Sequence, residues 1–203
     1  MACERAFKGN CLTCFPRSFV CIDIETTGLS PLYDDIIEVS GIRVEDGKAT
    51  AIFSETINIG RPLPPFITAL TGITDKELSK SNCAENVLTR FCNFVGGDIL
   101  LGHNVNFDIN FLYDKCLDKT GILFENDFVD TLKIGKKLLP QLKHHKLDDL
   151  AEYYDIPPRT LHRALGDCEM TVNCYFRMLD EIEDELSFYT AKKAQIKKFQ
   201  PSP

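Results

Sequence analysis

The chain has 203 residues, of which 44% are hydrophobic and 26% charged, a composition typical of one soluble globular domain. Its net charge of −7 argues against a surface that coats nucleic acid non-specifically. No apolar run is long enough to span a membrane, and the N-terminus lacks the apolar core of a signal peptide. Nine cysteines, most of them inside predicted strands and helices, indicate reduced thiols. We therefore expect a cytoplasmic protein without a membrane partner.

The chain opens with patterns that are typical of strands. Phe19–Glu25 is a short apolar run that predicts a buried strand. Ile36–Val44 and Ala49–Ile59 alternate apolar and polar residues, and the EDGK sequence between them is a hairpin signal. The proline-rich stretch Arg61–Pro65 ends this pattern. We therefore predict three antiparallel strands at the start of the domain.

The rest of the chain alternates between helical and strand patterns, after two short helical turns at 66–74 and 75–80. The predicted strands are Asp98–Asn104 and Phe128–Thr131. The predicted helices are Ala84–Val95, Asn106–Lys119, Leu132–Leu139, Lys146–Tyr154 and a long one from about Ala164 past Leu186. Three strands followed by alternating helices and strands predict an α/β domain with a mixed sheet.

Two like charges, Asp23 and Glu25, lie inside the apolar sequence VCIDIETTG. Successive residues of a strand point to opposite faces, so Asp23 and Glu25 share a face and repel each other. Burying even one unpaired carboxylate costs several kcal/mol, or raises its pKa until it is protonated. Another group must therefore compensate these charges.

Two further acids are predicted on the apolar sides of helices. Asp108, in GHNVNFDINFL, falls in the first turn of a helix, where the helix dipole by itself favours an acid. Asp167 falls on the buried side of the long C-terminal helix, where a carboxylate needs a partner. His162 precedes this helix on a predicted loop. It can be an ordinary surface residue, or a group that reaches whatever Asp167 binds.

Four acids from three separate elements repel each other unless a cation gathers them. Hard divalent cations prefer carboxylate oxygens, and Mg²⁺ or Mn²⁺ is the usual occupant of such sites. Two such ions about 3.5–4 Å apart hold the attacking and the leaving oxygen of a phosphoryl transfer. Zinc fits less well, because no quartet of Cys and His accompanies the acids. The pattern therefore predicts a site for two divalent metal ions.

Three motifs in chain order resemble those of the DEDDh, or DnaQ-like, 3′–5′ exonuclease family, which includes the proofreading epsilon subunit of bacterial DNA polymerase III. The motifs are DIETTG with Asp23 and Glu25, GHNVNFDINFL with Asp108, and HRALGDCEMT with His162 and Asp167. The resemblance covers residues 18–179 and implies a ribonuclease H-like fold. On this basis we assign 1–17 to a flexible N-terminal tail, 18–183 to an exonuclease domain and 184–203 to a helical, basic C-terminal tail.

The resemblance also implies a role for each matching residue. Asp23, Glu25 and Asp167 would hold the metal ion that activates a water molecule, and Asp23 and Asp108 would serve the second ion. His162 would be the general base that takes the proton of the water. The residues that would hold the terminal nucleotide are Thr26, Leu29, His103, Asn104 and Phe107. Leu29 and Phe107 are equally consistent with ordinary packing.

The implied substrate is a DNA 3′ end, in proofreading or repair, with RNA as the alternative because the same constellation also trims RNA. A catalytically silent binding module is a third interpretation, and the presence of all five catalytic residues argues against it. The implied protein partners are the DNA polymerase III catalytic subunit and a sliding clamp, although QIKKF at 195–199 resembles a clamp-binding peptide only faintly. The basic stretch 133–163 can be a solvated face or a flank of the acidic site.

Overall fold

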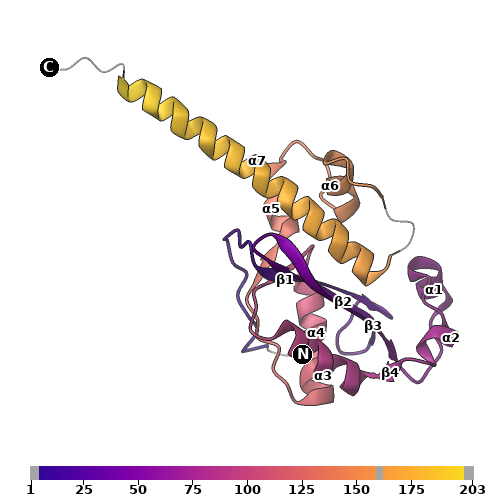
Figure 1. The fold of residues 1–203 in the computed structure, drawn as a ribbon. Coiled ribbons are helices and arrows are strands. Elements are labelled where there is room, and N and C mark those ends of the chain that lie inside the picture. Colours follow the sequence, from indigo (N-terminus) through magenta and orange to yellow (C-terminus); the bar gives the residue numbers. More distant parts are fainter. Residues whose placement is uncertain (1–4, 159–161, 199–203) are drawn as a thin grey trace.

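The computed structural model describes residues 5–158 and 162–198. Within these residues the strands form one mixed sheet in the order β4-β3-β2-β1-β5-β6 (Figure 1). The strands are β1 Phe19–Thr26, β2 Ile36–Glu45, β3 Lys48–Asn58, β4 Asn82–Cys83, β5 Leu100–Gly102 and β6 Phe128–Asp130. β1, β2 and β3 are antiparallel neighbours, whereas β5 pairs with β1 and β6 pairs with β5 in parallel. The predicted mixed sheet is confirmed.

Helices cover both faces of this sheet (Figure 1). The helices are α1 Pro65–Thr71, α2 Asp75–Leu78, α3 Ala84–Val95, α4 Asn106–Thr120, α5 Thr131–Leu138, α6 Leu147–Tyr153 and α7 Ala164–Lys198. α3 and α4 pack on one face, and α7, with α5 and α6 beside it, packs on the other. Most ends of the predicted strands and helices agree with the structure to within two residues, but the turn predicted at 66–74 ends three residues beyond α1, and β4 was not predicted. α7 continues without a break to Lys198, across the boundary predicted at 183.

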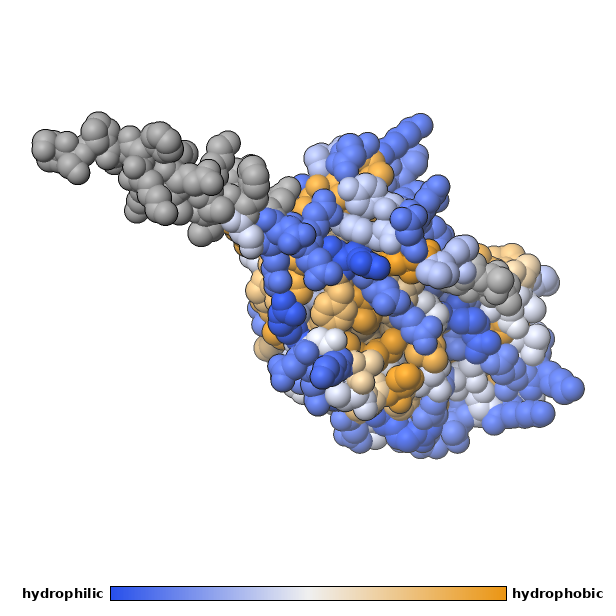
Figure 2. All heavy atoms as spheres, turned by 45° about the horizontal axis from the view of Figure 1, so that its top comes forward, coloured by the Kyte–Doolittle hydropathy of each residue, from blue (hydrophilic) through white to orange (hydrophobic). Residues whose placement is uncertain are grey.

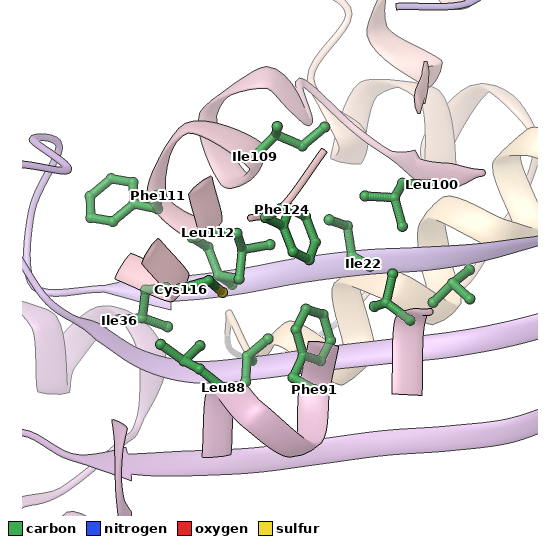
Figure 3. Close-up of a cluster of buried hydrophobic side chains, with 14 of the residues drawn as sticks. Ile22, Ile36, Leu88, Phe91, Leu100, Ile109, Phe111, Leu112, Cys116 and Phe124 are labelled. Atoms are coloured by element: carbon green, nitrogen blue, oxygen red, sulfur yellow. The ribbon is translucent and has the colours of Figure 1, made fainter. Parts of the chain in front are cut away.

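β1 lies inside the sheet, and its side chains are buried on both faces. Val20, Ile22 and Ile24 belong to the core under α3 and α4, which Figure 3 shows around Ile22. Phe19 and Cys21 belong to the core under α7. Full burial of one such aliphatic or aromatic side chain contributes about 1.5–3 kcal/mol. The same alternation places the side chains at 23 and 25 on the face that α7 covers.

The N-terminal segment 5–17 was expected to be a flexible tail, and for these residues that expectation is wrong. Leu12 N donates to Phe128 O at 2.7 Å, and Phe128 N donates to Asn10 O at 2.9 Å. Arg5 forms an ion pair of 2.6 Å with Asp114 of α4. The segment covers the edge of β6, which otherwise presents unpaired backbone groups. It was missed because backbone pairing of this kind leaves no apolar period in the sequence.

Hydrophobic side chains are exposed in places among a largely hydrophilic surface, as Figure 2 shows for one face. No helix in the described part of the chain is long and apolar enough to cross a membrane. The predicted clamp-like stretch ends at residue 199, which lies outside the described residues, as do residues 1–4.

Candidate active site

The four predicted acids come together where three elements meet. Asp23 and Glu25 lie at the carboxyl end of β1, Asp108 in the first turn of α4, and Asp167 in the first turn of α7. Asp108 Oδ1 accepts a hydrogen bond of 3.1 Å from the backbone N–H of Ile24, which ties α4 to β1. The α4 and α7 acids thus approach the end of β1 from the two faces of the sheet.

The burial of these acids makes their charges costly. Asp108 is 5% exposed and Asp167 is 6% exposed. Burial, followed by the negative charges of Asp108, Asp167 and Glu25, raises the pKa of Asp23 well above its ordinary value. Burial also raises the pKa of Asp108 well above its ordinary value, against the opposing effect of backbone hydrogen bonds. In the absence of a cation, the site therefore favours protonation of some of its carboxyl groups.

His162 lies directly before α7, as predicted, with 41% of its side chain exposed. Its Nδ1 is 3.7 Å from Asp167 Oδ2. The ligand atoms of Glu25, His162 and Asp167 all lie within 4.8 Å of one another. A loop position beside the acids gives the imidazole access both to solvent and to the carboxylates.

Two residues of the site, Glu38 and Arg163, were missed in the sequence. Glu38 lies on β2 directly opposite Glu25 of β1 and is 2% exposed. Arg163 Nη2 and Nε donate to the Glu38 carboxylate at 2.7 and 3.0 Å, and Ala164 N donates to it at 2.9 Å. Arg163 also contacts Glu77 of α2 at 3.1 Å. This network fixes the start of α7, and with it the backbone next to His162, onto β2 and α2.

A signal for this pair does exist in the sequence. Glu38 interrupts the apolar stretch IIEV of a predicted strand, and Arg163 follows His162 directly. The two residues are 125 positions apart, however, so the pattern of either segment does not reveal the partner.

Comparison with known proteins identifies the family. A family model of the RNase T type, described as "Exonuclease", matches residues 20–175. The chain belongs to this exonuclease family. Its curated relatives include the PolC-type DNA polymerase III of Latilactobacillus sakei, with 40% identity over 164 residues, and that of Bacillus subtilis, with 37% identity over 172 residues. These matches cover 80% and 83% of this chain but only 11% and 12% of the polymerases.

Solved structures of other exonucleases share the fold of this exonuclease domain. Exonuclease X in complex with 5′ overhanging duplex DNA has a TM-score of 0.62 at 24% identity, over 80% of this chain and 91% of that chain. E. coli exonuclease I in complex with a dT13 oligonucleotide has a TM-score of 0.69 at 18% identity, over 86% and 43% of the two chains. The predicted ribonuclease H-like fold is therefore confirmed.

The donor set of the exonuclease domain fits hard divalent cations. Its carboxylates supply the oxygen ligands that Mg²⁺ and Mn²⁺ prefer. Burial, and then the negative charges of neighbouring acids, raise the pKa of Asp23, and a bound cation would offset both effects. Within the described residues, Glu25, His162 and Asp167 form the one group of acidic, His or Cys side chains close enough to share an ion.

The turn after β1 carries two of the predicted nucleotide-binding residues. Thr26 Oγ1 donates to Gly28 O at 2.6 Å, so this hydroxyl helps to shape the turn. Ser30 N donates to Asp34 Oδ2 at 2.9 Å, and this hydrogen bond stabilises the end of the same turn. Leu29 at the tip is 85% exposed, so ordinary packing does not explain this leucine.

The other three predicted nucleotide-binding residues follow β5. His103 Nδ1 lies 3.0 Å from Thr131 Oγ1, and Asn104 N donates to Asp130 Oδ1 at 2.9 Å. Asn104 has a φ of 55°, a left-handed conformation that Asn tolerates better than most residues. Phe107 packs on Phe111 with ring centroids 5.0 Å apart and is only partly buried, so it has a packing role and keeps part of its side chain accessible.

Proposed function

We propose that this domain is a metal-dependent 3′–5′ exonuclease that releases nucleoside 5′-monophosphates from DNA 3′ ends. The observation that carries the proposal is the convergence of Asp23, Glu25, Asp108 and Asp167 at one strand end, with His162 beside them. The membership of the exonuclease family supports a nuclease, and the relatives named as DNA polymerases favour DNA over RNA.

In this proposal the four carboxylates hold two divalent ions, Mg²⁺ or Mn²⁺. When bound, such ions lower the pKa of water and neutralise charge on the transferring phosphate. His162 takes the proton of the attacking water, a role for which an imidazole side chain beside the carboxylates and open to solvent is suited. The water oxygen forms a new bond to phosphorus, the bond from phosphorus to the O3′ of the preceding nucleotide breaks, and this O3′ takes a proton from solvent to become the new 3′-hydroxyl. Arg163 and Glu38 hold the backbone beside His162 in place during this step.

The terminal nucleotide would lie between the two turns described above. Leu29 offers an exposed apolar side chain that can contact a base, and Phe107, which is partly buried, offers an aromatic ring for a second contact. Thr26, His103 and Asn104 would contribute polar contacts to the sugar. Contacts of this kind depend little on base identity, so we expect weak sequence preference.

The chain spans about an eighth of the length of the PolC-type relatives. Because these relatives are named as DNA polymerases, we propose proofreading or repair as the setting, with the DNA polymerase III catalytic subunit or a sliding clamp as partner. RNA is the competing substrate, since the same acids and His can serve either nucleic acid. The sugar 2′ position decides between them.

The test uses 5′-labelled oligonucleotides of equal length, as single-stranded DNA, mismatched duplex DNA and RNA, with and without Mg²⁺ or Mn²⁺. A ladder that shortens from the 3′ end, with DNA degraded faster than RNA, is the expected result. Asp108→Asn should abolish it, whereas Asp118→Asn, an exposed position on the same helix, should not. A faster loss of RNA would overturn the DNA assignment. Cleavage by Asp108→Asn at the wild-type rate would overturn the site.

A further inference from the structure

A groove with lysines along its rim lies beside the sheet edge, on a chain whose net charge is −7. It has a volume of about 590 Å³ and runs between residues 11–15, α5 and α7. Its apolar lining includes Leu12, Ile134, Leu138 and Ile182. Lys133, Lys136 and Lys137 of α5 also line it, and all three are exposed. We call this feature the α5 groove.

The α5 groove carries more positive than negative charge: among its described lining residues, three lysines face the single carboxylate of Asp130, whose charge acts on Lys133 and Lys136. Lys133 Nζ also donates to Cys11 Sγ at 3.1 Å. Among the described residues, no carboxylate lies within ion-pair distance of Lys133, Lys136 or Lys137. Asp130 also lines the groove, but it is 3% exposed and its Oδ1 accepts from Asn104 N and Leu132 N. An excess of cations at an accessible apolar surface favours an anionic occupant.

Lys8 extends this positive region toward the catalytic acids. Its Nζ donates to Asn106 and Asn110 of α4 at 2.8 and 3.1 Å, so neutral partners hold it. Burial, and then the positive charges of Arg5 and Lys133, lower the pKa of Lys8. Lys8 is therefore close enough to Lys133 for the two charges to interact. It also contacts Asn106, the first residue of α4, the helix that carries Asp108.

The α5 groove begins at the same edge of the sheet as the active site. Asp130 ends β6 and binds the backbone of Asn104, one of the candidate nucleotide-binding residues. β6 is separated from β1 by β5 alone. Val129 of β6 is level with Cys21 of β1 through Leu101 of β5, so Thr131 at the start of α5 is level with Asp23. Because neighbouring strands lie about 4.8 Å apart, the start of α5 is about 10 Å from Asp23. A strand held at the catalytic acids therefore reaches the start of α5 within a few nucleotides.

We propose that the α5 groove binds the single strand of nucleic acid that continues from the 3′ end held in the active site. Lys8, Lys133, Lys136 and Lys137 contact its phosphates. The apolar lining and Phe15, which is 42% exposed, contact its bases. This inference rests on the proposed nuclease function. An acidic, apolar peptide would match the same chemistry, but Asp130, which lines the groove and binds the backbone of Asn104, places the groove next to the candidate nucleotide-binding residues and favours the substrate strand.

The test compares the wild type with the triple variant Lys133→Gln, Lys136→Gln and Lys137→Gln. Binding of labelled DNA of about 3 and about 12 nucleotides is measured without metal, where no cleavage occurs, at several salt concentrations. The wild type should bind the strand of about 12 nucleotides more tightly than the strand of about 3. In the triple variant, the ratio of these two affinities should be at least about tenfold smaller. Its slope of log affinity against log salt should fall by about 2, since each single-strand phosphate contact contributes about 0.7.

A matched control removes three exposed lysines from β3, α2 and the turn after α2, toward the opposite edge of the sheet from β6, with Lys48→Gln, Lys76→Gln and Lys80→Gln. This control has the same net charge as the triple variant and should keep the length dependence. If the two variants behave alike, the effect is due to net charge and the proposal is overturned.

Two further outcomes separate this inference from the nuclease function. If the wild type cleaves DNA but gains no affinity with length, the groove proposal fails and the nuclease proposal stands. If DNA binding is unchanged in the triple variant while binding of a synthetic peptide of alternating Glu and Leu is lost, the groove is a protein-docking surface and the proposal is overturned. A length-dependent gain that the triple variant loses, in a protein without nuclease activity, supports the groove alone.

Discussion

Glu38 and Arg163 allow a sharp test of how the site is built, because only one of the two is buried. Glu38 is 2% exposed, while the Arg163 side chain is 39% exposed. Replacement of Arg163 by Met leaves a buried carboxylate whose remaining donor among the described residues is the amide of Ala164. Removing one partner of a buried pair costs about 3–5 kcal/mol, and the partial exposure of Arg163 favours the lower end. We expect Arg163→Met to lower the free energy of unfolding by about 3 kcal/mol.

The converse change should be milder. Glu38→Gln keeps an oxygen that can accept from Ala164 N and leaves Arg163 with Glu77 and solvent, so we expect a cost of about 1 kcal/mol. In the double variant no buried charge remains. Arg163→Met should therefore cost about 2 kcal/mol less in the Glu38→Gln background than alone, which is the coupling energy of a double-mutant cycle.

Urea unfolding of the four proteins measures these free energies. For a domain of this size, about 3 kcal/mol corresponds to a fall in Tm of about 6–12 °C. Arg163→Met should also lower kcat by about tenfold to a hundredfold, since it displaces His162, while Mg²⁺ still raises Tm. The reasoning is refuted if Glu38→Gln is the more destabilising change, or if the two costs simply add.

Three further predictions concern the acids and His162. Without metal, the raised pKa values of Asp23 and Asp108 mean that the folded state binds more protons than the unfolded state above the ordinary carboxyl pKa, so these two groups destabilise the fold as pH rises. Saturating Mg²⁺ should therefore raise Tm more at about pH 8 than at about pH 5.5, as scanning calorimetry would show; an equal gain at both pH values would contradict this. Asp108→Asn should raise the metal-free Tm and remove most of the Mg²⁺ effect on Tm. Asp118→Asn should change neither quantity. If the metal-free Tm of Asp108→Asn is below that of the wild type, the charge of Asp108 does not destabilise the fold. His162→Ala should lower kcat by about 10²–10⁴-fold and keep most of the Mg²⁺ effect on Tm, and a wild-type rate would remove His162 from the mechanism.

The sequence by itself determined the features that depend on local periodicity. Asp23 and Glu25 were placed on one face because a strand repeats every two residues, and the raised pKa of Asp23 follows first from the burial of that face. Asp167 was placed on the buried side of α7 by the helical period, and His162 on a loop by the prolines before it. Each of these inferences needs only neighbours within one element.

The tertiary structure alone decided which distant segments meet. The pairing of Glu38 with Arg163 joins residues 125 positions apart, and the backbone pairing of residues 10–12 with β6 leaves no side-chain pattern to read. Likewise, Lys8 and Lys133 belong to one positive region only because the N-terminal segment crosses α4 and the β6 edge. A local pattern specifies the face on which a side chain lies. The partner across that face depends on strand order and on the path of the chain, which only the folded molecule contains.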